Sequence, residues 1–274
     1  MCELFGMSSL RPSTVNFSLN AFATHGGARY GNNSGWGIAF YIDRDAFLIK
    51  EPEPASDSPW VQFIASQNVE SPCVIAHVRL ATVGTPTLRN THPFRRALGG
   101  RTHIFAHNGT LKGIRDAYQL ADLSHHPIGE TDSELAFCIL MERLQPLWRL
   151  KAEVPPLAER MAVFAEFAAE MLTRGPANFL YSDGETLFAH GHRRVYEVDG
   201  KLTDPRPPGL SIRNCLRWTV TPEPHCEGVK LQLADQQAVL VASVPLDDDG
   251  WVALDEGTAI AIEAGKERMR VSTL

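Results

Sequence analysis

Five residues in the first half of the sequence could together cleave an amide and hold its substrate: Cys2, Arg79, Asn108, Gly109 and Asp132. A thiol that attacks an amide carbonyl needs hydrogen-bond donors for the oxyanion of the tetrahedral intermediate, and the Asn108 side chain with the Gly109 N–H supplies two. A guanidinium binds a carboxylate through two parallel hydrogen bonds, which suits Arg79. A carboxylate such as Asp132 binds an ammonium. The set therefore favours cleavage of an amide in a small substrate with a zwitterionic head group.

The position of Cys2 gives this residue a base of its own. An initiator methionine before a small residue is normally removed, so we expect the mature chain to begin with the cysteine. A free α-amino group has a pKa of about 7.7–8.0 and a cysteine thiol one of about 8.5. The amine can therefore accept the thiol proton near neutral pH and later protonate the leaving group, without a histidine base. The alternative is that Cys2 is a small buried residue in a first strand.

Two of the other candidates also have purely structural interpretations. Asn108-Gly109 is typical of a type I′ hairpin turn, and Asp132 lies where a carboxylate favours the start of a helix. Both alternatives stay open at this point.

The elements that must position these residues alternate between strands and helices. Thr131 with Glu134 forms a capping-box pattern, which predicts a helix that begins near Asp132. Asp183-Gly184 predicts a hairpin turn within 178–192. Further strands are expected at 36–42, 47–50, 73–81, 103–109, 218–221, 229–233, 238–244 and 258–264, and further helices at 12–24, 56–69 and 155–172.

The composition excludes several classes of protein. The 274 residues are 44% hydrophobic and carry a net charge of -6, so neither nucleic acid nor an anionic membrane surface is expected as a partner. No apolar run reaches the length of a membrane helix, and the first residues lack the pattern of a signal peptide, which favours the cytoplasm. Five widely spaced cysteines do not indicate a disulfide framework and fit a reducing compartment.

Six short motifs follow one another along the sequence: CELFG at 2–6, GWG at 35–37, HVRLAT at 77–82, NTHPF at 90–94, FAHNG at 105–109 and ETDSE at 130–134. In this order they resemble the class II glutamine amidotransferases, which are N-terminal-nucleophile hydrolases with a type-2 glutaminase domain. The details are most similar to the small stand-alone members of the YafJ type. The resemblance implies a four-layer αββα sandwich of the α+β class, organised as one domain over 1–274, or 2–274 after processing.

The resemblance also implies a role for each matching residue. Cys2 corresponds to the nucleophile, and Asn108 with Gly109 to the oxyanion hole. Arg79 corresponds to the residue that binds the substrate α-carboxylate, and Asp132 to the one that binds the α-ammonium. Thr82 and His92 align with positions that line or support the pocket.

Two positions depart from the larger synthase members of the family. Leu80 and Val83 stand where those proteins carry tryptophan and histidine, in a loop that closes over glutamine and communicates with a synthase. The departures leave the core chemistry untouched but give no support for synthase coupling.

The expected activity is hydrolysis of the γ-amide of glutamine, or of a related γ-glutamyl compound, through a thioester on Cys2. The alternatives are a subunit that requires a separate synthase or peptidase partner, a catalytically silent binding protein with the same fold, and an acylase for apolar amides. No cofactor and no metal are expected, and a homo-oligomer remains open. The second half of the chain is expected to complete the sheets, with 221–233 shaping specificity.

Overall fold

The computed structural model describes residues 2–15, 34–81, 84–149, 153–198, 200–217, 236–247 and 250–274. The strands are β1 (Glu3–Thr14), β2 (Trp36–Ile42), β3 (Asp45–Glu51), β4 (Glu70–Val78), β5 (Phe94–Leu98), β6 (Arg101–Gly109), β7 (Ala177–Ser182), β8 (Leu187–Gly191), β9 (Glu197–Val198), β10 (Lys201–Leu202), β11 (Ser211–Arg217), β12 (Gln236–Ala242), β13 (Val252–Ala253), β14 (Thr258–Glu263) and β15 (Lys266–Ser272). The α-helices are α2 (Pro59–Gln67), α3 (Ile114–Ala117), α4 (Asp132–Arg149) and α5 (Leu157–Met171).

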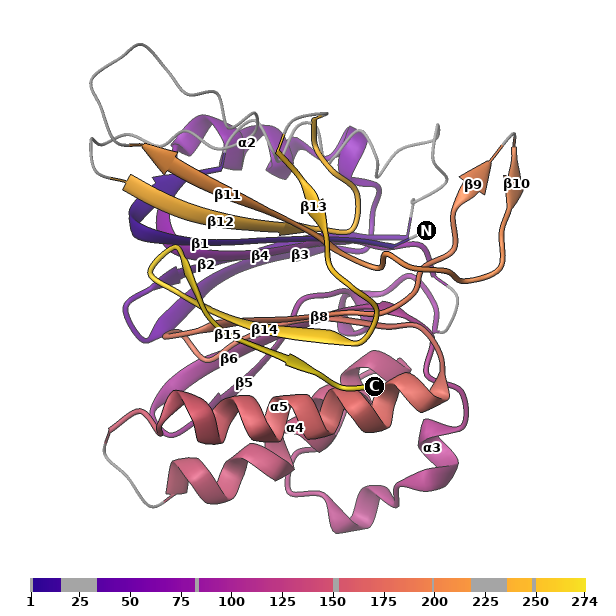
Figure 1. The fold of residues 1–274 in the computed structure, drawn as a ribbon. Helices are drawn as coiled ribbons and strands as arrows, with labels where there is room; N and C mark the ends of the chain where they lie inside the picture. Colours follow the sequence, from indigo (N-terminus) through magenta and orange to yellow (C-terminus); the bar gives the residue numbers. More distant parts are fainter. Residues whose placement is uncertain are drawn as a thin grey trace.

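Two antiparallel sheets form the centre of the molecule. One has the strand order β13-β11-β12-β1-β4-β2-β3 and the other the order β15-β14-β8-β7-β6-β5. The sheets lie face to face, with α2 outside the first sheet and α4 and α5 outside the second (Figure 1). This arrangement confirms the expected α+β sandwich with helices on the outside of two packed sheets.

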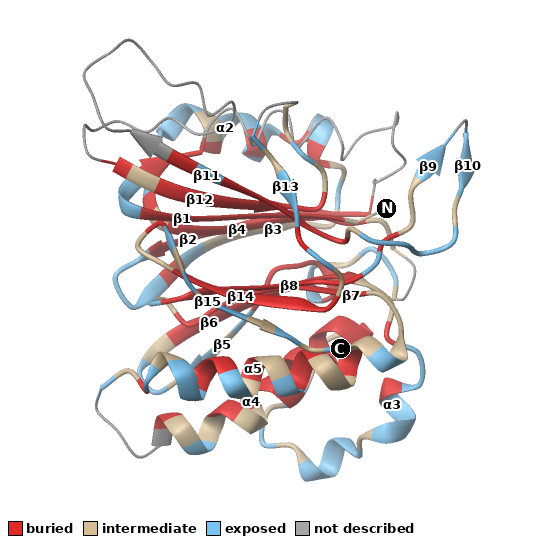
Figure 2. Ribbon diagram, in the orientation of Figure 1, coloured by how far each residue is buried: buried red, intermediate tan, exposed pale blue. Residues whose placement is uncertain are grey.

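The alternation of side chains along the strands explains the layers. In β6, Ile104 and Ala106 point into the core between the sheets, whereas Phe105 points into the core beneath α4 and α5. In β1, Leu4 lies between the sheets and Phe5 faces the side that α2 covers. Both faces of these central strands are therefore buried, which Figure 2 shows as red strands between layers whose outer faces are exposed.

Most predicted elements near the motifs are confirmed. The backbone N–H of Glu134 donates to Thr131 Oγ1 at 3.1 Å, and α4 begins at Asp132 as the capping-box pattern predicts. Ser58 caps α2 by accepting from the backbone N–H of Trp60. Asp183-Gly184 lies in the turn between β7 and β8.

The helix predicted over 12–24 is wrong at its start. β1 continues to Thr14, where Ser13 and Thr14 pair with Ser71 and Glu70 after an irregularity in the ladder. Strand pairing with β4 satisfies this backbone, so the proline at position 12 does not open a helix. Residues 16–24 lie outside the described residues, as do the strands predicted at 218–221 and 229–233 and most of the segment 221–233.

The last third of the chain completes both sheets, as expected. β12 pairs with β1 in the first sheet, whereas β14 pairs with β8 in the second. Cys215 in β11 takes part in a disulfide, which corrects the expectation that the cysteines form none; Cys2, Cys73 and Cys138 are free. Within the described ranges, no helix is both long and apolar enough to cross a membrane.

Candidate active site

The predicted site residues gather at one end of the two sheets. β1 begins one residue after Cys2, and its first residue Glu3 pairs with Val78, the last residue of β4. Arg79 follows that residue directly. In the other sheet Gly109 is the last residue of β6. Strand ends that are far apart in sequence therefore bring the thiol, the guanidinium and the Asn-Gly pair together, on the side where the chain begins in Figure 1.

The thiol of Cys2 is held by the backbone of Leu80. The Leu80 N–H donates to Sγ at 3.2 Å, and the Sγ–H group lies 3.2 Å from the Leu80 carbonyl oxygen, which can accept from it. Burial raises the pKa of the Cys2 thiol, while the Leu80 hydrogen bond and the Arg79 charge act in the opposite direction. The resting group is therefore a thiol at neutral pH, and attack requires a base to take its proton.

Asn108 lies beside the nucleophile. Its Nδ2 donates to the Cys2 carbonyl oxygen at 2.6 Å and to Ser243 Oγ at 3.2 Å. Ser243 Oγ also accepts from the backbone N–H of Leu4 at 3.0 Å, so one hydroxyl links the Asn108 amide to the start of β1. The amide is thereby fixed within reach of any group bound at the thiol.

Gly109 is required by close packing between strands. A Cβ atom at this position would lie 1.8 Å from the Pro176 carbonyl oxygen and 2.6 Å from Nε2 of His107. Asn108 and Gly109 pair with Asn178 and Ala177 in the β6–β7 ladder. The Asn-Gly pair therefore ends a strand and is not the hairpin turn that the dipeptide alone also allows.

Arg79 is buried and tied to two loops. Its guanidinium donates to the carbonyl oxygens of Ser34 (3.3 Å), Gly84 (3.0 Å) and Thr85 (3.3 Å). Burial lowers its pKa, and the proximity of Cys2 and Asp132 opposes that effect. The side chain thus carries its positive charge into the site and orders the loops around it.

Asp132 is the first residue of α4 and is likewise buried. Its Oδ2 accepts from the backbone N–H of Leu111 at 2.6 Å, and the Ser133 hydroxyl donates to Oδ1 at 3.4 Å. The carboxylate is consequently held in one orientation by the chain that follows β6, rather than only placed near the helix start.

Three buried histidines surround this end of the sheets. The ring centroids of His77 and His92 are 4.2 Å apart, and no ring nitrogen of either finds a hydrogen-bond partner among the described residues. Burial lowers the pKa of His77 to about 3 and also lowers that of His92. His107 lies within hydrogen-bond distance of Ser133 Oγ (2.9 Å) and the Pro176 carbonyl oxygen (3.1 Å), and burial lowers its pKa. All three rings are neutral at pH 7.

Two hollows are lined in part by Cys2. The first, with an empty volume of about 270 Å³, is lined by Cys2, Arg79, His92, Gly109 and Asp132 together with neighbouring backbone. The structure therefore brings these predicted residues to one cavity. Thr82 lies outside the described residues.

The second hollow, with an empty volume of about 440 Å³, is lined by Cys2, Asn108, Gly109, Arg194 and neighbouring residues. Sequence reasoning missed Arg194 and Ser243 because both come from the second half of the chain, where no motif marked them. Leu80 was noted only as a departure from the family, although its backbone holds the thiol.

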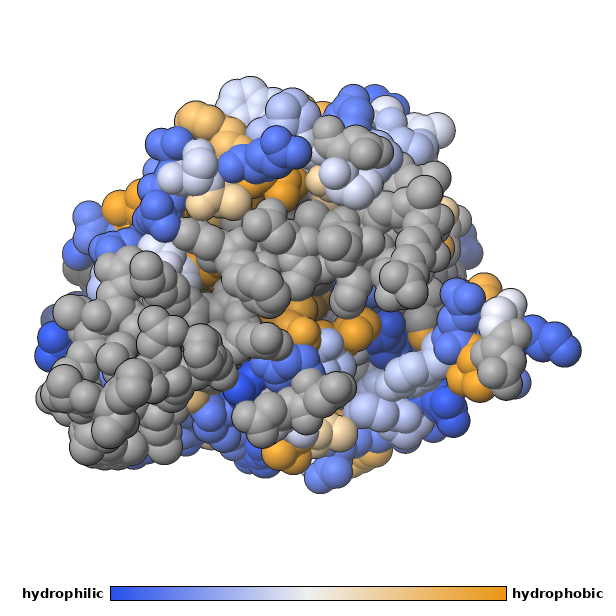
Figure 3. Space-filling model, turned by 90° about the horizontal axis from the view of Figure 1, so that it is seen from above, coloured by the Kyte–Doolittle hydropathy of each residue, from blue (hydrophilic) through white to orange (hydrophobic). Residues whose placement is uncertain are grey.

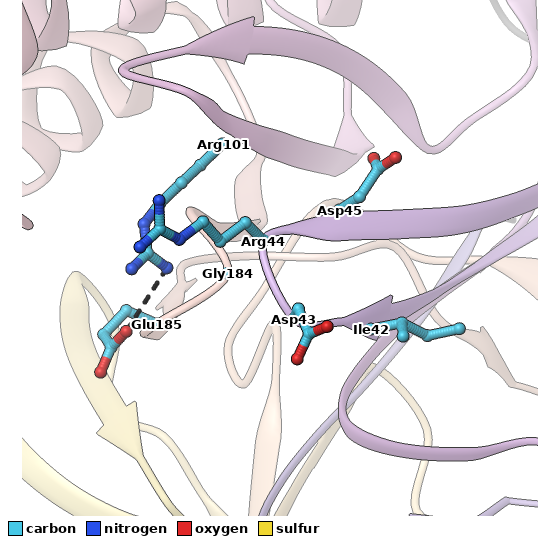
Figure 4. A pocket seen from close by; sticks show the side chains of 7 residues that line it. All are labelled: Ile42, Asp43, Arg44, Asp45, Arg101, Gly184 and Glu185. Carbon is cyan, nitrogen blue, oxygen red and sulfur yellow. Dashed lines mark ion pairs between the residues drawn. The ribbon is translucent and has the colours of Figure 1, made fainter.

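A third hollow lies elsewhere and contains none of the predicted site residues. It is formed at the turn between β2 and β3 and includes Arg44, Arg101 and Glu185. Arg101 forms an ion pair with Glu185 at 3.4 Å, drawn as a dashed line in Figure 4. Since Trp36, at the other end of β2, pairs with Val78 beside the thiol, this hollow lies at the far end of the sheet.

Comparisons with known proteins agree with the fold and the motifs. The family of the class II glutamine amidotransferases matches residues 1–206. "Putative glutamine amidotransferase YafJ" of Escherichia coli (strain K12) is 37% identical over 190 residues, which cover 69% of this chain and 72% of that protein.

Solved structures with the same fold include a predicted glutamine amidotransferase from Pseudomonas aeruginosa PA01, with a TM-score of 0.67 and 29% identity over 97% of this chain and 99% of that one. The glutamine phosphoribosylpyrophosphate amidotransferase from B. subtilis has a TM-score of 0.57 at 13% identity, and the match covers all of this chain and 49% of that one, which shows the fold alone. The chain belongs to the class II glutamine amidotransferase family.

Proposed function

We propose that this protein hydrolyses the γ-amide of glutamine, or of a related γ-glutamyl compound, through a γ-glutamyl thioester on Cys2. The observation that carries the proposal is the first hollow, in which one free thiol shares a cavity with a buried guanidinium and a buried carboxylate. These are the groups that a reacting γ-carbonyl, an α-carboxylate and an α-ammonium require. A purely structural cluster would not need a free thiol at its mouth.

The reaction begins with proton removal from the thiol. Once Met1 is removed, the α-amino group of Cys2 is the base nearest in the chain, and its ordinary pKa suits transfer near neutral pH. The N–H of Leu80, which donates to Sγ at 3.2 Å, stabilises the thiolate that results. The thiolate attacks the γ-carbonyl carbon, and the protonated amine then gives its proton to the departing nitrogen. Water hydrolyses the thioester and regenerates the thiol.

The oxyanion of each tetrahedral intermediate is stabilised by Asn108 and Gly109. One N–H of the Asn108 amide donates to the Cys2 carbonyl oxygen at 2.6 Å, and the other, which donates to Ser243 Oγ over 3.2 Å, exchanges that acceptor for the oxyanion when the intermediate forms. The backbone N–H of Gly109 is the second donor. Fixed donors of this kind are typically the largest contribution to acyl-transfer catalysis.

The head group is selected by charge. Arg79 binds the α-carboxylate and Asp132 binds the α-ammonium, and His92 lines the same hollow. The three neighbouring histidines are neutral and so do not offset either charge. An apolar acyl chain has nothing to pair with these two buried ions, which argues against an acylase for apolar amides.

The proposal is tested by release of ammonia and glutamate from glutamine, with the N-terminal mass checked in the same sample. Chain that begins with Cys2 is expected to release both products in equal amounts, whereas Cys2→Ala releases neither. Cys73→Ala is the matched control, because burial raises the pKa of that thiol to about 12 and it lies away from both hollows. Absence of release from glutamine and from γ-glutamyl amides by correctly processed protein would contradict the proposal and favour a partner-dependent subunit or a silent binding protein.

A further inference from the structure

The second hollow beside Cys2 has a different lining from the hollow that holds the head group in the proposed function. It shares Cys2, Leu80 and Gly109 with the head-group hollow, but Arg79 and Asp132 line only the first and Arg194 only the second. If the γ-glutamyl head group fills the first hollow, as the proposed function requires, the amine released from the γ-carbonyl departs into the second. The side chains that line this second hollow therefore contact the part of the substrate that glutamine lacks.

Arg194 is the distinctive group in that hollow. The residue is only 7% exposed. Nη1 donates to the Ser243 carbonyl oxygen, whereas Nε is buried without a hydrogen-bond partner in the described part of the chain. Among the described residues Arg194 has no carboxylate oxygen within 4.0 Å of its guanidinium nitrogens; burial lowers its pKa, and the charge of Glu3 opposes that effect. A buried guanidinium with unpaired donors is costly unless a ligand supplies the counter-charge.

The surroundings of Arg194 hold it in place and add positive charge. Its guanidinium lies 5.1 Å from the centroid of the Tyr196 ring, and that of Arg206 lies 5.1 Å from the same ring. The backbones of Arg194 and Arg206 exchange two hydrogen bonds of 3.0 and 2.9 Å, and the Tyr196 hydroxyl donates to the Pro208 carbonyl oxygen. The wall is thus fixed before any ligand arrives, and both of its ion-forming side chains are cations.

The chain leads directly from this wall into the β9–β10 hairpin. That hairpin projects from the body of the protein on the side where β1 begins (Figure 1). Val198 and Leu202 of this hairpin are 47% and 71% exposed. The view from above shows apolar surface at the right-hand edge of the molecule (Figure 3).

We propose that the preferred substrate is a γ-glutamyl amide whose leaving amine itself carries a carboxylate, that is, a γ-glutamyl amino acid or peptide, and that Arg194 binds this carboxylate. The unpaired Nε–H and the neighbouring Nη2 form the planar edge that binds a carboxylate through two parallel hydrogen bonds. In the reaction the bond from the γ-carbon to the amide nitrogen breaks, the nitrogen takes the proton from the α-amino group of Cys2, and a free amino acid or peptide leaves. Water then releases glutamate from the thioester.

The proposal rests on the proposed function but is tested by binding, which needs no turnover. Cys2→Ala protein is titrated in a calorimeter with γ-glutamyl-glycine and with γ-glutamyl-glycinamide, which differ only in the carboxylate. The acid is expected to bind about tenfold or more tightly than the amide, because a hydrogen bond to a charged group in a buried site is lost in the amide. Equal affinity for the two compounds would overturn the proposal.

Two further variants in the Cys2→Ala background identify the residue responsible. Arg194→Gln is expected to abolish the preference for the acid, and Arg194→Lys to reduce it, since lysine keeps the charge but not the planar edge. Arg193→Gln is the matched control: it is adjacent in sequence but pairs with Glu256 at 2.5 Å, so the preference should remain. A preference that survives in folded Arg194→Gln protein would overturn the assignment to Arg194.

Turnover by the Cys2 protein separates the two proposals. Failure to hydrolyse glutamine and both γ-glutamyl compounds would contradict the proposed function, even if the acid binds more tightly. Hydrolysis of all of them with equal kcat/KM for acid and amide would leave the proposed function standing and overturn the present inference.

Discussion

Protonation of His77 is expected to destabilise the fold in mild acid. This ring is fully buried in β4, lies against the tilted ring of His92, and has no hydrogen-bond partner for either nitrogen among the described residues. Burial and the nearby Arg79 charge lower its pKa to about 3. In the unfolded chain the same imidazole has a pKa of about 6.5. Between these two values the unfolded state binds a proton that the folded state does not.

The size of the effect follows from that difference. A group whose pKa is lowered by folding contributes full stability above its unfolded pKa, and the contribution falls as the pH drops towards its folded pKa. Each pH unit below about 6.5 costs about 1.4 kcal/mol, so His77 alone should cost about 2 kcal/mol between pH 7 and pH 5. Domains of this kind have total stabilities of about 5–15 kcal/mol, so the loss is a sizeable fraction.

Urea unfolding at pH 7 and pH 5 measures this contribution. The comparison is between the wild-type chain and His77→Gln, with the exposed His126→Gln as the matched control. The stability lost on acidification should be about 2 kcal/mol smaller in His77→Gln than in wild type, whatever its absolute stability, and unchanged in His126→Gln. An equal loss in wild type and His77→Gln would refute the argument that His77 is held neutral by burial.

Four further substitutions probe the site. Asn108→Ala should lower kcat for glutamine by about a hundredfold to a thousandfold with little change in KM. Ser243→Ala, which removes the acceptor of both the Asn108 amide and the Leu4 N–H, should lower it less; an equal loss in both would show that Ser243 does more than position these two groups. Arg79→Lys should raise KM by about tenfold or more, because lysine cannot form two parallel bonds to a carboxylate; steady-state kinetics showing a pure kcat effect would count against head-group binding. Gly109→Ala should destabilise the fold by about 3 kcal/mol in urea unfolding, since its Cβ would lie 1.8 Å from the Pro176 carbonyl oxygen, and wild-type stability would contradict that packing.

Much of the site could be predicted because its residues lie in short motifs that end strands. Cys2, Arg79, Asn108, Gly109 and Asp132 each come within one residue of a strand or helix end, and such ends lie at the rim of a layered fold where side chains converge. The capping box at the start of α4 is likewise a local pattern, whereas the layers were expected from the family resemblance, because the central strands are buried on both faces and show no alternation in burial. The roles of these residues, the single-domain organisation and the cytoplasmic location stay predictions.

Other features depended on contacts between distant parts of the chain. Ser243 reaches the Asn108 amide only because β12 pairs with β1 across more than two hundred residues of sequence, and the register of that pairing leaves no local mark. Arg194 lies in a segment of irregular backbone with no periodicity. The start of the helix predicted over 12–24 failed for the same reason, since pairing of Ser13 and Thr14 with β4 overrode the local preference. The spacing of the cysteines along the sequence likewise gave no indication of the disulfide at Cys215.

The central claim is that Cys2 carries the γ-glutamyl group during the reaction, and trapping that thioester tests it most directly. Processed protein is mixed with glutamine or a γ-glutamyl ester, quenched in acid within the first turnover, digested, and examined by mass spectrometry. The account predicts one added γ-glutamyl group on the peptide that begins with Cys2, at a level that decays as glutamate appears, and none on the peptides that carry Cys73 or Cys138. An unmodified Cys2 in protein that is turning over, or a γ-glutamyl group on another residue, would contradict it.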